Sequence, residues 1–231
     1  MGLGGGGTGT VRPGEVSLAH NGVLFLDELP EFSRMSLEVL RQPIETENYD
    51  FPFARKLHLS LQHYVGCGNE SVPVRIFNDP SGKCTCTPQK IHNYLNKISG
   101  PLLDRFDIHI EVSAVKFDEL RDKEQTEPSA EIKKRVDKAR KIQSERYKGT
   151  STSCNANINA EQFEKVCIID DEAEQMLKSA FESMGMTARA YDRVLKVART
   201  IADLDNSEII KSDHILEAVQ YRSLDRKYWG K

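Results

Sequence analysis

Several features that mark other classes of protein are scarce or missing in this sequence of 231 residues. It has five cysteines, an odd number, and only Cys84 and Cys86 are closely spaced, which is a poor disulfide framework and suits a reducing compartment. No apolar run approaches the roughly 20 residues that a membrane span needs, so we expect a cytoplasmic protein with no membrane partner. The net charge is only -3, so contact with nucleic acid would need a local basic patch.

The sequence also lacks a phosphate-binding loop. The string Gly-x-x-x-x-Gly-Lys-Ser/Thr occurs nowhere, and the glycines at positions 4 to 7 are not followed by Lys-Ser or Lys-Thr. The backbone amides and the lysine of such a loop cradle the β- and γ-phosphates of a nucleotide. We therefore expect that this chain alone does not hydrolyse ATP.

What the sequence does contain is a short apolar run that ends in two carboxylates. Residues 23–26 predict a strand buried on both faces of a parallel sheet, and Asp27 and Glu28 follow it directly. At such a strand end, one acid can orient the water shell of a magnesium ion while its neighbour polarises the attacking water. A solvated acidic turn is the alternative. Ser33 is the predicted cap of the next helix, and Pro43 is expected to limit its far end.

The predicted elements change character along the chain. Helical segments are expected from Pro88 to about Lys97 and in a short turn after residue 101, and alternating Ile108, Ile110 and Val112 predict a strand over residues 107–112. Past residue 127, apolar stripes at three- and four-residue steps predict only helices, near 128–147, 170–184, 187–204 and from about 212 onward. The sequence thus predicts an α/β domain over residues 1–126 and an all-α domain over 127–231.

Three stretches resemble one family of nucleotide hydrolases. Residues 21–32 read Asn-Gly-Val-Leu-Phe-Leu-Asp-Glu-Leu-Pro-Glu-Phe, which looks like the Walker B segment of AAA+ ATPases, and the last four residues are similar to the magnesium-chelatase-like ComM/YifB branch. Residues 98–107 and 187–204 resemble the arginine-finger motif and the lid helix of the same branch. The resemblance extends from about residue 13 to residue 226, except for residues 53–76. It implies an incomplete AAA+ P-loop NTPase core with a parallel sheet, followed by an all-α C-terminal lid domain.

The resemblance also implies roles for single residues in the core. Asp27 and Glu28 would act in cis, and Asp27 would hold magnesium through water. Arg105 would be the arginine finger that reaches a neighbouring subunit's nucleotide, because a permanently charged, planar guanidinium stabilises the charge of phosphoryl transfer. Without the resemblance, a salt bridge of Arg105 with Asp104 or Asp107 is the simpler interpretation.

Two arginines compete for one role in the predicted lid helix. By resemblance, Arg189 is the sensor 2 arginine, which reaches the nucleotide phosphates in cis. Arg193, one helical turn further on, is the competing assignment, and either side chain could be an ordinary surface charge. The basic run Lys133–Lys141 is a candidate for DNA contact, although most such runs are the solvated face of a helix.

The intact family implies an ATP- and Mg²⁺-dependent hexameric ring that acts on DNA in branch migration, competence or recombination. Because the phosphate-binding loop and the family's preceding Lon-protease-like domain are absent, Met1 is expected to be an internal or truncated start. One alternative is the ATPase subunit of a true magnesium chelatase. Another is a non-catalytic module in which residues 127–231 bind partners.

Residues 53–76 do not match the family, which has Met-Asn-Pro-Cys-Pro-Cys-Gly with the sensor 1 asparagine in this region. A DNA sequence can be written that encodes residues 65–76 and that, when it is translated from its second base, gives this family string. We therefore hypothesise compensating frameshifts near residues 52–57 and near Ile76, with a divergent insertion as the alternative. Residues 57–63 alternate by chance, and part of this stretch could still pair as a strand.

The hypothesis also bears on metal binding. Cys84 and Cys86 would be the surviving half of a four-cysteine set that could bind zinc in the intact family. Two cysteines cannot close a structural zinc site, so we expect no zinc here.

Overall fold

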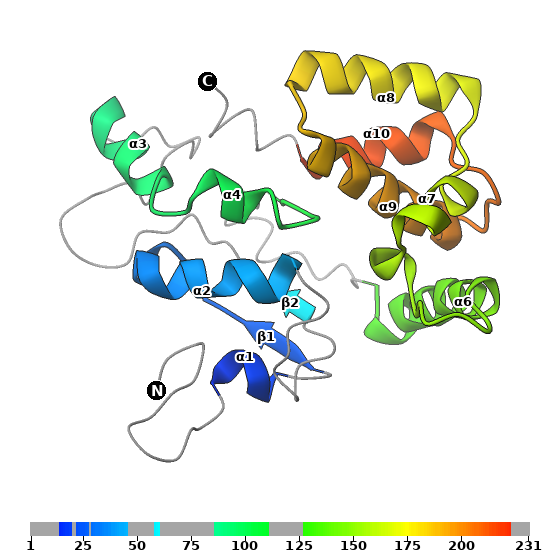
Figure 1. Cartoon of the computed structure of the whole chain (residues 1–231), viewed down its shortest axis with the longest axis horizontal. Coiled ribbons are helices and arrows are strands. Elements are labelled where there is room, and N and C mark those ends of the chain that lie inside the picture. Colours follow the sequence, from blue (N-terminus) through cyan, green and yellow to red (C-terminus); the bar gives the residue numbers. More distant parts are fainter. Residues whose placement is uncertain are drawn as a thin grey trace. The chain divides into compact units, whose positions relative to one another are not determined.

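The computed structural model describes residues 14–19, 22–27, 29–45, 58–60, 86–110 and 127–222. These residues belong to two compact units (Figure 1). Of the described residues, unit 1 holds those from 14 to 106 together with Ile110, and unit 2 holds residues 107–109 and 127–222. Residues 107–109 therefore belong to unit 2, while Phe106 and Ile110 on either side of them belong to unit 1.

Unit 1 combines short helices with a pair of strands. Its elements are α1 (Glu15–Leu18), β1 (Val23–Phe25), the 3-10 helix η1 (Leu29–Glu31), α2 (Arg34–Glu45), β2 (His58–Ser60), α3 (Pro88–Leu95) and α4 (Gly100–Leu103). β1 and β2 are parallel, with Val23 opposite His58 and Phe25 opposite Ser60. This confirms that part of the 57–63 stretch forms a strand. Among the described residues this pair is the whole sheet, so the larger parallel core stays a prediction.

The apolar core of unit 1 lies on one side of β1. Leu24 and Leu26 are buried against residues of α1, η1, α2 and α4, among them Val16, Leu29, Leu37, Leu40 and Leu102. The prediction that β1 is buried on both faces is wrong, because Val23 is 64% and Phe25 is 50% exposed. Successive side chains of a strand point to opposite faces, and α2 and α4 lie against only one of them.

The predicted helix starts in unit 1 are confirmed. The Ser33 hydroxyl accepts a hydrogen bond from the Ser36 amide (3.1 Å) before α2, and the Thr87 hydroxyl caps α3 by accepting one from Lys90 (3.4 Å). Helix α2 ends at Glu45, two residues past Pro43, so the proline lies in its last turn. This agrees with the prediction that Pro43 limits the far end of the helix.

The predicted strand over residues 107–112 is also wrong for the residues that the structure describes. Residues 107–110 have no regular secondary structure, and Ile108 and Ile110 are 51% and 60% exposed. Alternation alone does not supply a partner strand. The backbone of this segment bonds elsewhere, since the His109 amide donates to the carbonyl of Tyr221 in unit 2 (2.8 Å).

Unit 2 is helical, apart from an isolated bridge between Ile169 and Ile210. Its elements are α6 (Ser129–Arg146), the 3-10 helix η3 (Asn155–Asn157), α7 (Ala160–Val166), α8 (Asp171–Met184), α9 (Ala188–Leu204) and α10 (Ser212–Gln220). α10 packs against both α8 and α9, while α6 and η3 pack against α9. α9 is therefore the central helix of the unit.

Side-chain caps fix the helix starts of unit 2. The predicted cap Asp170 accepts a hydrogen bond from the Ala173 amide (2.8 Å) and begins α8. Thr187 accepts one from Ala190 (3.1 Å) and begins α9. Between them, Gly185 ends α8 in the left-handed conformation (φ +60°) that glycine adopts without steric cost. Helix α7 is not among the elements predicted from the sequence, and Asn159 and Gln162 begin it with a reciprocal capping box.

The apolar stripes of α8, α9 and α10 meet in one core, as predicted. Its buried members include Ala173 and Leu177 of α8, Val194, Leu195, Ala198 and Ala202 of α9, and Ile215 and Ala218 of α10. The stripe of α6 is only partly buried, because Ala139 lies inside while Ile132 and Val136 are 44% and 45% exposed. In the described part of the chain, no helix is both long enough and apolar enough to span a bilayer.

Candidate functional site

Asp27 lies at the carboxyl end of β1. Leu26, one residue earlier, is buried, and the alternation of the strand leaves Asp27 exposed. Ligands of α/β proteins bind outside the carboxyl ends of parallel strands, and a carboxylate there suits the oxygen-rich shell that magnesium prefers. Glu28, its predicted partner, lies outside the described residues.

Arg105 follows α4, whose Leu102 and Leu103 anchor the turn in the core of unit 1. The arginine is 7% exposed, and its guanidinium donates a hydrogen bond to the carbonyl of Pro101, one turn earlier. In this conformation the side chain folds back onto α4. It would have to leave that carbonyl in order to reach a ligand on another subunit.

Arg189 and Arg193 occupy successive turns of α9 and differ in their surroundings. Arg189 lies in the first turn after the Thr187 cap and is exposed. The Arg193 side chain is 17% exposed and forms an ion pair with Asp107. Asp107 therefore pairs with an arginine of unit 2, two residues after Arg105.

Comparison with known proteins explains why these residues occur in one chain. Residues 1–120 match the family model of magnesium chelatase, subunit ChlI, and residues 126–222 match that of the ChlI C-terminal region. The chain is 39% identical over 236 residues to competence protein ComM of Haemophilus influenzae, and 39% identical over 223 residues to the uncharacterized protein YifB of Escherichia coli. The chain belongs to the magnesium-chelatase-like ComM/YifB family.

The match to the ComM/YifB family covers almost all of this chain but less than half of its relatives. The aligned regions include 95% and 96% of the chain, and 43% of the length of both ComM and YifB. A protein of Mycobacterium tuberculosis is more distant, at 30% identity over 225 residues, and is also covered to 43%. The chain thus spans somewhat under half the length of these relatives.

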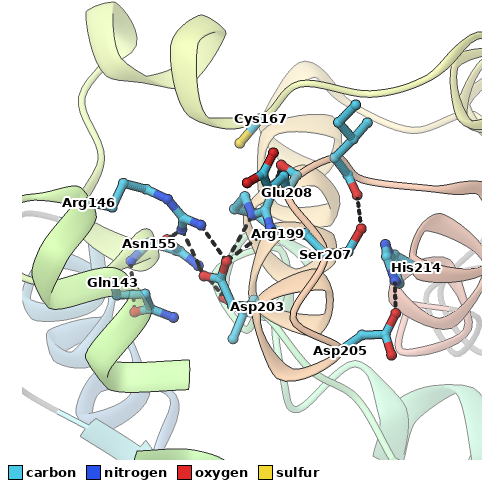
Figure 2. Close-up of polar contacts among 12 residues, drawn as sticks. Gln143, Arg146, Asn155, Cys167, Arg199, Asp203, Asp205, Ser207, Glu208 and His214 are labelled. Atoms are coloured by element: carbon cyan, nitrogen blue, oxygen red, sulfur yellow. Dashed lines mark hydrogen bonds and ion pairs between the residues drawn. The ribbon is translucent and has the colours of Figure 1, made fainter. Parts of the chain in front are cut away.

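The polar cluster around Asp203 was missed by the sequence analysis (Figure 2). The Asp203 side chain is fully buried. Its carboxylate accepts two hydrogen bonds from Arg146 of α6 (2.8 and 2.5 Å) and one from Asn155 of η3 (2.8 Å). It accepts two more from Arg199 of α9 (3.2 and 2.9 Å). Burial alone would raise the pKa of Asp203, but the hydrogen bonds from Arg146 and Asn155 and the charge of Arg199 hold it below its usual range. One carboxylate therefore joins α6, η3 and α9.

Arg199 extends this cluster to the loop after α9. It is 1% exposed and donates to the carbonyls of Ser207 and Glu208, the latter at 2.6 Å. With its bonds to Asp203, the guanidinium ties the loop after α9 to the buried carboxylate. Because the Asp203 carboxylate already accepts five hydrogen bonds, it is suited to fixing α9 and not to catalysis or metal binding.

A sequence signal for this cluster existed in α9. Arg199 and Asp203 are four residues apart, so they lie on the same face of the helix. They also continue the spacing of the apolar stripe through Leu195 and Ala202. A charged pair within a buried stripe indicates an internal ion pair.

The cysteines show no preformed metal site in the described part of the chain. Cys86 is partly exposed just before α3, while Cys84 lies outside the described residues. No group of three or more His, Cys, Asp or Glu side chains among the described residues is placed to hold a metal ion. Cys167 is buried in unit 2, and burial raises the pKa of its thiol to about 11, which makes it a core residue and not a ligand.

The basic run Lys133–Lys141 lies on α6, with most of its side chains exposed. Lys133 pairs with Asp137 (3.0 Å) and Lys134 with Glu131 (2.7 Å), both on the same helix. Arg135 pairs with Glu127, just before the helix. Such exposed pairs contribute little to stability, so phosphate groups could compete for these cations.

Proposed function

We propose that this chain is the Walker B, arginine-finger and lid portion of an ATP-driven, hexameric AAA+ motor that acts on DNA, and that it does not hydrolyse ATP alone. The observation that supports this best is Asp27 at the carboxyl end of a parallel strand, in a chain of the ComM/YifB family. The sequence has no phosphate-binding loop, so the groups that cradle the β- and γ-phosphates must come from outside it.

Each residue has a role in this proposal. Asp27 orients magnesium through water, and Glu28 polarises the attacking water. Arg189, exposed in the first turn of α9, contacts the phosphates of its own subunit's nucleotide. Arg105 leaves the Pro101 carbonyl and stabilises the transition-state charge on the nucleotide of a neighbouring subunit.

The names of the relatives favour the DNA motor over a magnesium chelatase subunit. The proteins that align with at least 95% of this chain are called ComM and YifB, and one of them is a competence protein. The helical core of unit 2 is also compatible with a module that only binds partners. A test of the catalytic residues separates an ATPase from a module that only binds partners.

We expect the purified chain to show no ATP turnover above background, because the phosphate cradle is missing. The direct measurement is phosphate release with the wild type and with Glu28→Gln in parallel. Steady turnover by the wild type that Glu28→Gln abolishes would contradict this expectation.

The roles themselves can be tested in a chimera that joins this chain to the part of E. coli YifB preceding the matched region. Asp27→Asn and Arg105→Ala should each abolish turnover, whereas the matched control Arg135→Ala on α6 should not. If Arg105 acts in trans, an equal mixture of the two inactive variants should regain activity. In a ring assembled at random, about one interface in four joins a subunit with intact Asp27 to a neighbour that supplies an intact Arg105. A mixture that assembles but stays inactive would contradict the trans role.

A further inference from the structure

A pocket of about 360 Å³ opens in unit 1 between η1, the start of α2 and the end of α3. Six of its lining residues carry polar or aromatic side chains, namely Glu31, Phe32, Arg34, Asn93, Asn96 and Lys97. Asp27 and Arg105, which the structure also describes, do not line it, so the proposed catalytic roles do not explain the pocket. Pockets of roughly 300–1,000 Å³ hold small ligands in proteins. This one therefore has room for a group the size of one nucleotide.

Lys97 is held at this pocket by two neighbours. Its Nζ atom lies 3.1 Å from a carboxylate oxygen of Glu31 and 5.2 Å from the centre of the Tyr94 ring, which is buried in unit 1. Both members of the ion pair have almost half of their side-chain surface exposed, and such pairs contribute little to stability. The ammonium group is therefore already in place, yet a stronger anion can take it from Glu31.

Arg34 supplies a second cation at the pocket and is exposed in the first turn of α2. Within the part of the chain that the structure describes, its guanidinium has no hydrogen bond or ion pair, while the nearby Glu38 pairs with Arg41. A guanidinium matches the geometry of a phosphate group and can bind it through two parallel hydrogen bonds. The lining thus has two cations and only one carboxylate, that of Glu31, which favours an anionic ligand.

The lining also includes an aromatic ring, that of Phe32, which is partly buried and packs against the core of unit 1. Asn93 accepts a hydrogen bond from Gln89 (3.0 Å), which leaves its amide nitrogen without a partner among the described residues. Asn96 directs its amide nitrogen to the His92 ring (2.9 Å), which leaves its carbonyl oxygen as an acceptor. A fixed ring is a platform on which a base can stack, and amide side chains hydrogen-bond the edges of bases. An acidic peptide would use the two cations but not the ring.

We propose that this pocket binds one nucleotide of a single strand of nucleic acid. In that complex the phosphate lies between Arg34 and Lys97, and the base stacks on Phe32. The phosphate takes the place of the Glu31 carboxylate beside Lys97. A duplex does not enter in this way, because its bases are stacked and paired. The biological meaning of the site rests on the proposed action on DNA, whereas binding itself needs no ATP.

Fluorescence anisotropy of the purified chain with a labelled oligothymidylate, without ATP, tests the site. Lys138, Arg140 and Lys141 are first replaced with alanine, so that the basic run of α6 does not contribute to binding. In this parent chain, Arg34→Ala and Lys97→Ala should each reduce the slope of log affinity against log salt concentration by about 0.7, the value for one phosphate contact to a single strand. At about 0.1 M salt, each should therefore weaken binding about fivefold.

Further variants separate recognition from a disturbed fold. Phe32→Leu should weaken binding about fivefold or more, the loss of one stacked base, and leave the salt slope unchanged. Glu31→Gln removes the competing carboxylate and should tighten binding about twofold, which a disturbed fold would not do. Lys90→Ala on α3 and Glu161→Gln on α7 are the matched controls and should have no effect, because both residues are exposed and neither lines the pocket.

Photo-crosslinking locates the bound strand, and an oligonucleotide that contains iododeoxyuridine should cross-link to Phe32. No binding by the parent chain, equal binding by its Arg34→Ala and Lys97→Ala variants, or cross-links confined to unit 2 would overturn the proposal. An oligoglutamate that displaces the strand, together with unchanged binding by Phe32→Leu, would identify a site for acidic peptides and would also overturn it. These measurements involve no ATP turnover, so a failure of the pocket is distinct from a failure of the catalytic roles tested in the chimera.

Discussion

Asp203 shows how a single buried carboxylate can organise a helical unit. It has no exposed side-chain surface and accepts hydrogen bonds from Arg146, Asn155 and Arg199, which lie on three elements. Arg146 and Asp203 are 57 positions apart in the sequence. The carboxylate therefore holds α6 and α9 in a fixed register, which apolar packing alone specifies less strictly.

Substitution of Asp203 should be strongly destabilising. Asp203→Asn keeps the shape of the side chain but leaves Arg146 and Arg199 without a counter-charge, and breaking a buried ion pair costs about 3–5 kcal/mol. Urea unfolding followed by circular dichroism measures the change. Asp205→Asn is the matched control. Asp205 is exposed and pairs with His214 (Figure 2), so its loss should cost under about 1 kcal/mol.

The same residue should make stability depend on pH in acid. The pKa of Asp203 is lower in the folded chain than its ordinary value of 3.8, so the folded state favours the ionised form. This contribution is fully present above the unfolded pKa and is lost as the pH falls below about 4 toward the folded value. The melting temperature of the wild type should therefore drop more steeply below pH 4 than that of Asp203→Asn. Parallel pH profiles for the two proteins would count against the lowered pKa.

At the scale of elements, α6 is where contact with DNA can be tested. Lys138, Arg140 and Lys141 are exposed on this helix, next to the cations that pair with Glu127, Glu131 and Asp137. If they contact phosphates, replacing all three with alanine should weaken DNA binding for every sequence and reduce the salt slope by about one per lost contact.

The control for this experiment is Lys165→Ala on α7, a lysine that also pairs with an acid four residues away. Fluorescence anisotropy with labelled DNA at several salt concentrations measures both quantities. Equal affinity and slope in the triple variant and the wild type would identify the basic run as a solvated helix face.

The elements differ in how well their sequences predict them. Helices α8, α9 and α10 could be located because each has a capping residue or a clear apolar stripe, as Asp170 and Leu177 show for α8. The strand predicted at 107–112 failed because Ile108 and Ile110 alternate without a strand beside them. Periodicity describes one segment, whereas a strand also needs a partner.

The candidate site was predictable only in part, because a local pattern does not show which distant residues a side chain contacts. Resemblance to family motifs singled out Asp27, Arg105 and Arg189 as candidates, since each lies in a recognisable local string. It could not show that Arg193 pairs with Asp107, 86 residues away. Nor could it show that Arg105 is turned inward, because burial of a side chain depends on residues distant in sequence.

At the scale of the whole molecule, unit 2 should fold without unit 1. Residues 127–222 contain the apolar core that the described residues of the unit form, together with the Asp203 cluster. We expect this fragment, expressed alone, to give a helical circular dichroism spectrum and a cooperative thermal transition. The fragment with Asp203→Asn is the control and should melt at a lower temperature. A disordered spectrum for the unsubstituted fragment would contradict the prediction.

The frameshift hypothesis for residues 53–76 stays a prediction, because most of that segment lies outside the described residues. Its one described part, β2, pairs in register with β1. A peptide that was not selected for this sheet can still form backbone hydrogen bonds, since ladder pairing depends little on side chains.

The one-sided burial of β1 also affects how the isolated chain behaves in concentrated solution. Among the described residues, β1 has a hydrogen-bonded neighbour on one edge only, and it exposes half or more of Val23 and Phe25. An unpaired edge beside an apolar surface is the arrangement through which chains associate. A charge of -3 spread over 231 residues gives only weak repulsion between molecules. If no other part of the chain covers this edge, association in concentrated solution should begin at these few residues, and a charged residue in place of Val23 or Phe25 should reduce it.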